Sequence, residues 1–207
     1  MSQNATNDHP HETEPQCLLR SPELMNSDDT ALLVIDVQQR LVPAIHEAAR
    51  VVWNCRRLLD GAAALGLPRM ATEQNPAKLG TTEAELASRL SAPAAAKMDF
   101  SCLECRSVMP TWREAGITRI ALCGIEAHVC VQQTALDLLA EGWCVYVAAD
   151  AVGSRRKFDW QIALRRLEAC GATITTTEAM LFEWCRRAGT PEFRRISELV
   201  KEQPPGA

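Results

Sequence analysis

The chain has 207 residues, which is enough for one domain with a substantial hydrophobic core and small for two. Hydrophobic residues make up 47% and charged residues 23%, as in ordinary globular proteins. The net charge of −4 argues against a nucleic-acid or anionic-membrane partner, because basic clusters bind both. No apolar run approaches the roughly 20 residues that a membrane-spanning helix needs.

The nine cysteines are an odd number, and most fall inside expected strands or helices rather than in a loop framework. No apolar secretory segment precedes them, so we expect reduced thiols and a cytoplasmic protein. Residues 1–17 are polar and lack apolar periodicity. We therefore predict a disordered tail, followed by one domain over residues 18–203.

From residue 31 onward, short apolar runs alternate with segments of helical periodicity. In chain order we predict strand 31–35, helix 46–65, strand 69–72, helix 82–90, strand 94–97, helix 110–115, strand 119–123, helix 130–141, strand 144–149, helix 158–169, strand 172–176 and helices 179–188 and 191–201.

Strands that alternate with helices through short connections are typical of a parallel sheet covered on both faces. Right-handed crossovers then give a three-layer α/β/α fold around a doubly wound, mainly parallel sheet of about six strands. In such sheets, ligands bind beyond the carboxyl ends of the strands. The residues at those ends are Asp36, Glu73, Gln74, Lys97, Cys130 and Asp150.

Cys130 stands where a strand turns into the start of a helix. Free N–H groups and the positive end of the helix dipole favour thiolate over thiol at such a place. The Lys97 ammonium would stabilise the thiolate by its charge, and the Asp36 carboxylate would hold Lys97 and receive the thiol proton. The three side chains together predict a nucleophilic site.

Attack of a thiolate on an amide or ester carbonyl creates an oxyanion, which backbone N–H groups at a tight turn can stabilise. We expect the amides of Glu126 and Cys130 to do so. Cys130 would form a thioester, ammonia or an amine would leave, and water would then release the acid.

Six motifs in this order resemble the isochorismatase-like cysteine hydrolase superfamily, over residues 30 to about 201. They are Ala31-Leu-Leu-Val-Ile-Asp36-Val-Gln38, Thr72-Glu-Gln74, Lys97-Met-Asp-Phe-Ser101, Gly124-Ile-Glu-Ala-His-Val-Cys130-Val, Asp150-Ala-Val-Gly-Ser-Arg155 and Ile174-Thr-Thr-Thr-Glu178.

The resemblance implies an isochorismatase-like hydrolase domain with a catalytic triad of Asp36, Lys97 and Cys130. It also implies a non-proline cis peptide bond between Ile125 and Glu126, a small-molecule substrate and a homo-oligomer. On this basis we expect a hydrolase that cleaves a C–N bond or, as a lesser possibility, an ester.

Two departures from related enzymes narrow this expectation. Nicotinamidases of the superfamily carry an Asp-x-His metal motif after the second strand, whereas residues 72–76 here contain no histidine. We therefore expect neither a metal nor another cofactor. Isochorismatases that act on a vinyl ether can lack the cysteine, so the presence of Cys130 favours acyl transfer. Ala127 replaces a threonine that is common in the superfamily, which leaves the backbone donors in place.

Further residues are candidates for the wall of a substrate pocket. His128 lies two residues before the thiol, and Arg155 could bind a substrate carboxylate or a neighbouring subunit. Phe100 could line the pocket or pack under Lys97. The complete set is Gln38, Glu73, Gln74, Phe100, His128 and Arg155.

Three other functions remain open from the sequence. The chain could hydrolyse a vinyl ether of the isochorismate type through Asp36, with Cys130 as a bystander. It could be a non-catalytic, oligomeric binding protein with the same pocket. Cys102 and Cys105 have the spacing of a redox pair or of half a zinc site, although a lone pair is weak evidence for either.

Overall fold

A parallel β-sheet forms the centre of the computed structural model, which describes residues 20–105 and 109–206, without the side chains of residues 109 and 110. Within these ranges, six strands lie in the order β3-β2-β1-β4-β5-β6, and every neighbouring pair is parallel. The strands are β1 Thr30–Ile35, β2 Arg69–Gln74, β3 Ala95–Lys97, β4 Arg119–Ile125, β5 Cys144–Gly153 and β6 Thr173–Thr175. The expected tail over residues 1–17 lies outside the described ranges.

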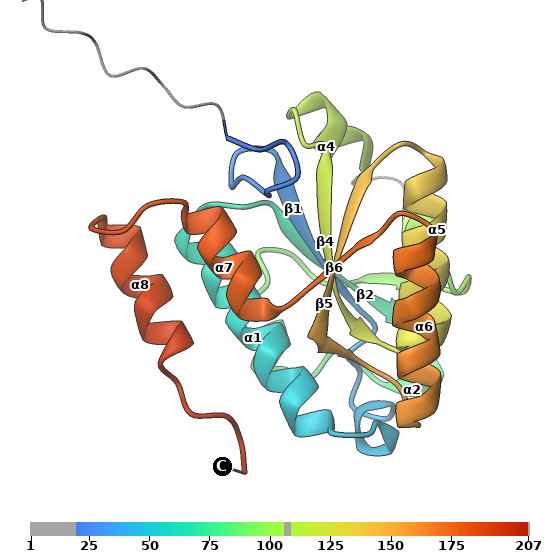
Figure 1. Cartoon of the computed structure of the whole chain (residues 1–207). Coiled ribbons are helices and arrows are strands. Elements are labelled where there is room, and N and C mark those ends of the chain that lie inside the picture. The colour runs from blue at the N-terminus through green and yellow to red at the C-terminus, as the bar shows by residue number, and fades with distance from the viewer. Residues whose placement is uncertain (1–19, 106–108, 207) are drawn as a thin grey trace, which may run out of the picture.

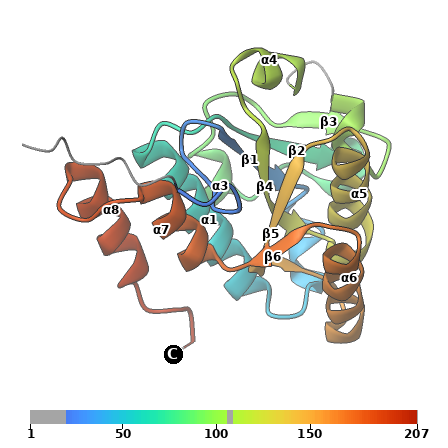
Figure 2. The ribbon, with the colours of Figure 1, turned by 45° about the horizontal axis from the view of Figure 1, so that its top comes forward.

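Helices cover both faces of the sheet (Figures 1 and 2). Helices α1, α7 and α8 lie on one face, and α5 and α6 lie on the other. The α-helices are α1 Ala48–Ala64, α2 Pro76–Leu79, α3 Ala84–Ala87, α4 Met109–Glu114, α5 Gln132–Ala140, α6 Lys157–Ala169, α7 Thr177–Cys185 and α8 Pro191–Val200. Short 3₁₀ turns, η1 Val42–Ala44 and η2 Cys102–Cys105, and one π-helical turn, η3 Ala127–Val131, complete the connections.

Strand β1 shows why the sequence folds in this way. All six of its residues are buried, as expected for a parallel strand with helices on both faces. Because side chains alternate along a strand, Leu32 and Val34 pack toward α1 and α7, whereas Leu33 and Ile35 pack toward α5 and α6. The predicted three-layer α/β/α fold is confirmed.

Several element boundaries differ from the prediction, and four of the differences lie near the carboxyl edge of the sheet. Strand β4 continues two residues beyond 123, and β5 continues to Gly153, because the two strands pair again after a register shift. The helix expected from residue 130 begins earlier, with the π-helical turn from Ala127. The helix expected over 82–90 is shortened to α3, and Thr82 is not its cap. Instead, the Thr82 N–H and hydroxyl both bind Glu73 Oε1, at 2.7 and 2.8 Å.

Gly124 allows β4 and β1 to approach closely just before the site. Its φ is +118°, and a Cβ atom there would lie 2.1 Å from the carbonyl oxygen of Ile35. Glycine is the residue that tolerates both the positive φ and this contact. The close approach sets the end of β4 beside Asp36, the residue that follows β1.

Candidate active site

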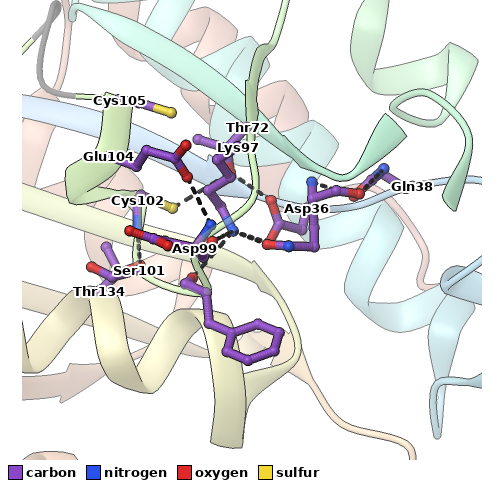
Figure 3. Close-up of polar contacts among 12 residues, drawn as sticks. Asp36, Gln38, Thr72, Lys97, Asp99, Ser101, Cys102, Glu104, Cys105 and Thr134 are labelled. Carbon is purple, nitrogen blue, oxygen red and sulfur yellow. Dashed lines mark hydrogen bonds and ion pairs between the residues drawn. The ribbon is translucent and has the colours of Figure 1, made fainter. Parts of the chain in front are cut away.

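Asp36 lies at the end of β1 with its side chain fully buried. Its φ of 52° places it in the left-handed region, which turns the chain sharply out of the strand. The two carboxylate oxygens have different donors (Figure 3). Thr72 Oγ1 donates to Oδ1 at 2.8 Å, and Lys97 Nζ donates to Oδ2 at 2.7 Å. Asp36 is therefore held by one side chain from β2 and one from β3.

Lys97 ends β3, and its side chain is fully buried as well. Among the described residues, four oxygens accept hydrogen bonds from Nζ: Asp36 Oδ2 at 2.7 Å, Gln74 Oε1 at 2.9 Å, and the carbonyls of Phe100 at 3.1 Å and Asp99 at 3.2 Å. An ammonium has three hydrogens to share among them. Burial is the largest single effect and lowers the Lys97 pKa, but the charge of Asp36, its hydrogen bond with the amine, and the neighbouring Cys102 and Cys130 together outweigh burial, so the pKa is raised. The amine is thus a fixed positive charge.

Cys130 lies in η3 and is 6% exposed. Burial, followed by the charge of Asp36 and a hydrogen bond to that carboxylate, raises the pKa of the Cys130 thiol to about 12, although Lys97 acts in the opposite direction. The expectation that the helix start favours a resting thiolate is therefore wrong. At neutral pH the Cys130 side chain is a thiol in contact with Asp36. Since Asp36 also binds Lys97, the structure brings Asp36, Lys97 and Cys130 together at one edge of the sheet.

The turn between β4 and η3 has the backbone geometry that the resemblance implies. The peptide bond between Ile125 and Glu126 is cis. The Glu126 carbonyl accepts from Val129 N at 3.0 Å and from Val131 N at 3.2 Å, which closes the turn around Cys130. The role of the Glu126 and Cys130 amides as an oxyanion hole stays a prediction.

Gln38 and Gln74 form an amide clamp next to Lys97. Gln38 Nε2 donates to the Gln74 carbonyl at 3.0 Å, and Gln38 Oε1 accepts from Gln74 N at 2.8 Å. The Gln74 side chain in turn contacts Lys97 through Oε1 and donates from Nε2 to the Met98 carbonyl at 2.7 Å. The structure thus gives both candidate pocket residues partners inside the protein, and Gln74 belongs to the site as a partner of the amine.

The remaining pocket candidates have different surroundings. The Glu73 carboxylate accepts hydrogen bonds from the N–H and the hydroxyl of Thr82. Phe100 is 52% exposed, although its carbonyl reaches Lys97. His128 Nδ1 lies 2.9 Å from Ser154 Oγ, and Arg155 Nε pairs with Glu126 Oε2 at 3.0 Å. Phe100, His128 and Arg155 therefore remain candidates for substrate contact.

Asp150 ends the predicted fifth strand, and its carboxylate contacts groups other than Asp36, Lys97 and Cys130. Its Oδ1 accepts from Thr177 N at 2.8 Å and from Thr177 Oγ1 at 3.0 Å. It also lines a cavity of about 310 Å³ with Arg50, Ser154 and Trp160. Asp36, Lys97 and Cys130 do not line that cavity.

Cys102 and Cys105 contact different groups. Cys102 Sγ lies 3.5 Å from Thr72 Oγ1, and Cys105 Sγ lies 4.0 Å from the Ala96 carbonyl. Burial raises the pKa of both thiols, that of Cys102 to about 11. Since the thiolate is the redox-active form, this environment does not favour a redox pair. The eight cysteines within the described ranges are free thiols.

Two residues that bind Asp36 or the turn after Lys97 were not among the candidate site residues of the sequence analysis. Thr72 holds Asp36, and Glu104 binds the backbone that follows Lys97. Thr72 belongs to a motif quoted for the resemblance, whereas no local pattern indicates Glu104. Among the described residues, no group of three or more His, Cys, Asp or Glu side chains could hold a metal ion. No helix in the described ranges is long and apolar enough to cross a membrane.

Comparison with known proteins identifies the family. The Isochorismatase domain model matches residues 30–179. Isochorismatase domain-containing protein 1 of Danio rerio is 37% identical over 175 residues, which are 82% of this chain and 60% of that protein. The chain thus spans less than two thirds of this relative. Isochorismatase domain-containing protein 2 of Danio rerio is 36% identical over 182 residues, which are 87% of this chain and 91% of that protein.

A solved structure agrees with these sequence matches. The structure of the MAR1 ribonuclease from Caenorhabditis elegans has a TM-score of 0.80 and 34% identity, and the match covers 88% of this chain and 94% of the other. The six motifs of the sequence analysis all lie within residues 30–179, the region that the family model matches. The chain therefore belongs to the isochorismatase family.

Proposed function

We propose that this protein is a cysteine hydrolase that cleaves an amide-type C–N bond of a small molecule through a thioester on Cys130. The observation that carries the proposal is the buried Asp36 carboxylate, which contacts both the Lys97 ammonium and the Cys130 thiol. A proton acceptor, a fixed positive charge and a nucleophile thus share one buried network.

The first half of the reaction forms the thioester. Asp36 accepts the Cys130 proton as the sulfur attacks the substrate carbonyl, because a thiol with a pKa of about 12 does not ionise by itself at neutral pH. Lys97 stabilises the developing negative charge on sulfur, and the amides of Glu126 and Cys130 would hold the oxyanion. Asp36 then gives its proton to the leaving nitrogen, and the C–N bond breaks.

The second half releases the acid. Asp36 accepts a proton from water as the water oxygen attacks the thioester carbon. The C–S bond then breaks, and the proton returns from Asp36 to the Cys130 sulfur. Lys97 keeps its proton throughout, since the oxygens around Nζ all require a donor. Its contribution is therefore electrostatic.

The test compares wild type, Cys130→Ser and Cys102→Ser on a panel of small amides, with RNA included because the Caenorhabditis elegans relative is described as a ribonuclease. Cys102 is the matched control, because it is a buried thiol in the same network. We expect Cys130→Ser to lose hydrolysis and Cys102→Ser to keep it. The intact mass of the wild type during turnover should show an acyl group on Cys130.

Other outcomes would assign a different chemistry. Equal amide hydrolysis by wild type and Cys130→Ser would remove the thiol from the mechanism. Pyruvate release from an isochorismate-like vinyl ether by both proteins, without amide hydrolysis, would show the vinyl-ether reaction instead. A chain that hydrolyses none of these compounds and carries no acyl group would be left as a binding protein.

The expected cytoplasmic location stays a prediction.

We also propose that the chain forms a homo-oligomer. Phe158 and Ile162 lie one turn apart on α6 and are 67% and 42% exposed. Exposed apolar side chains that lie next to each other are typical of surfaces that bind another protein. We expect sedimentation equilibrium to give a multiple of the chain mass, and Phe158→Glu to reduce it. A wild-type mass of one chain would contradict the proposal.

A further inference from the structure

Glu104 is an exposed residue of η2 that binds the backbone directly after Lys97 (Figure 3). Its Oε2 accepts hydrogen bonds from Met98 N and Asp99 N, both at 2.7 Å. These two backbone hydrogen bonds lower the pKa of the Glu104 carboxyl. The side chain is therefore an ionised acceptor for two consecutive N–H groups at neutral pH.

The turn that Glu104 binds is held from its inner side as well. The peptide unit between Met98 and Asp99 has its N–H on Glu104 and its C=O on Gln74 Nε2, at 2.7 Å. The next two carbonyls, of Asp99 and Phe100, point to Lys97 Nζ at 3.2 and 3.1 Å. The turn over residues 98–100 is thus bound by Glu104 and Gln74, and it carries two of the acceptors of Lys97.

We propose that Glu104 is a positioning residue, which fixes the turn over residues 98–100 so that its carbonyls hold the Lys97 ammonium against Asp36 and Cys130. The inference rests on the proposed function of these three residues. It adds a residue outside the buried network that controls the geometry inside it.

The effect is expected to come from geometry rather than from charge. Glu104 is exposed, so water and salt screen its charge at the distance of Lys97. The turn is held by one side-chain oxygen that accepts hydrogen bonds from Met98 N and Asp99 N, and a side chain as long as glutamate is required to place it there. Glutamine offers such an oxygen without the charge, whereas aspartate keeps the charge and is one methylene too short. The two variants therefore separate the two explanations.

Loss of the contact should appear at the thiol. If the carbonyls of Asp99 and Phe100 move away, Lys97 is no longer fixed beside Cys130, whose pKa its charge lowers. The pKa of Cys130, which burial already raises, then rises further. A rise of roughly half to one unit slows thiolate-dependent alkylation about 3–10-fold, since one unit is a factor of ten.

The experiment measures iodoacetamide labelling of Cys130 between pH 8 and 10 by peptide mass spectrometry, in Glu104→Ala, Glu104→Asp and Glu104→Gln. In wild type the rate should rise about tenfold per pH unit, without a plateau, because the pKa lies above this range. We expect the Ala and Asp variants to react about 3–10-fold more slowly at each pH and Gln to match wild type. The exposed Cys144 serves as the internal control and should react equally in all four proteins.

Three results would overturn the inference: Ala and Asp variants as fast as wild type or faster, a Gln variant as slow as Ala, or an Asp variant that matches wild type while Gln does not. The Asp and Gln variants decide the question even if Ala fails to fold. Labelling needs no substrate, so a protein without amidase activity would refute the proposed function and leave this test intact. Conversely, unchanged labelling in a Cys130-dependent amidase would refute the role of Glu104 alone.

Discussion

An Asp36→Asn variant is expected to fold and to hydrolyse amides about 10²–10⁴-fold more slowly than wild type, the usual contribution of a general acid–base group. Asparagine cannot accept the proton of the Cys130 thiol, whose pKa of about 12 keeps it protonated at neutral pH. Asparagine also tolerates the φ of 52° at this position better than most residues. The measurement is kcat/KM on the best amide of the panel, together with a melting curve.

Asp150→Asn is the matched control for this loss. Asp150 also lies near the carboxyl edge of the sheet, but its carboxylate accepts hydrogen bonds from Thr177. We expect this variant to hydrolyse the amide about as fast as wild type. Full activity of Asp36→Asn, or an equal loss in Asp150→Asn, would show that the Asp36 carboxylate is not the proton acceptor.

The sequence predicts the fold class, and the fold class in turn predicts that Asp36, Lys97 and Cys130 lie close together. Parallel strands end at the same edge of the sheet, so residues that follow different strands are brought together there. The strand order was not available from spacing, and it sets what Lys97 must do. Strand β2 lies between β1 and β3, so the lysine side chain reaches across β2 to Asp36, passing Gln74 on the way.

The protonation of Cys130 could not be predicted, because the argument from the helix start uses local dipoles only. Burial and the neighbouring Asp36 are tertiary effects, and together they outweigh the attraction of Lys97 for a thiolate. Gln74 and Glu104 show a second limit. Whether a polar residue near a strand end faces substrate or a neighbouring side chain depends on the turn over residues 98–100, and no periodic pattern describes that turn.

A Lys97→Met variant is expected to lower the free energy of unfolding by about 3–5 kcal/mol, the usual cost of removing one partner of a buried ion pair. Both side chains of the pair are 0% exposed, so no water compensates Asp36 when the ammonium is gone. Urea denaturation at neutral pH measures the loss. An unchanged unfolding midpoint would show that the Asp36 carboxylate is solvated or protonated when Lys97 is absent.

Removing Lys97 and removing Asp36 should lower the free energy of unfolding by different amounts. After Asp36→Asn, Lys97 keeps three of the acceptors that the described residues offer: Gln74 Oε1 and the carbonyls of Asp99 and Phe100. After Lys97→Met, Asp36 keeps the Thr72 hydroxyl and the Cys130 thiol, which are neutral donors to a buried charge. We therefore expect Lys97→Met to be the more destabilised variant.

The double variant Asp36→Asn/Lys97→Met separates the stability of this site from its chemistry. With both charges removed, the asparagine introduced at position 36 can still accept from Thr72 and no ion of the pair remains, so the double variant should be more stable than Lys97→Met alone. It should nevertheless stay inactive, because the proton acceptor and the fixed charge are both missing. A double variant whose loss of stability equals the sum of the two single losses would contradict the coupling and, with it, the view that each charge is present because of the other.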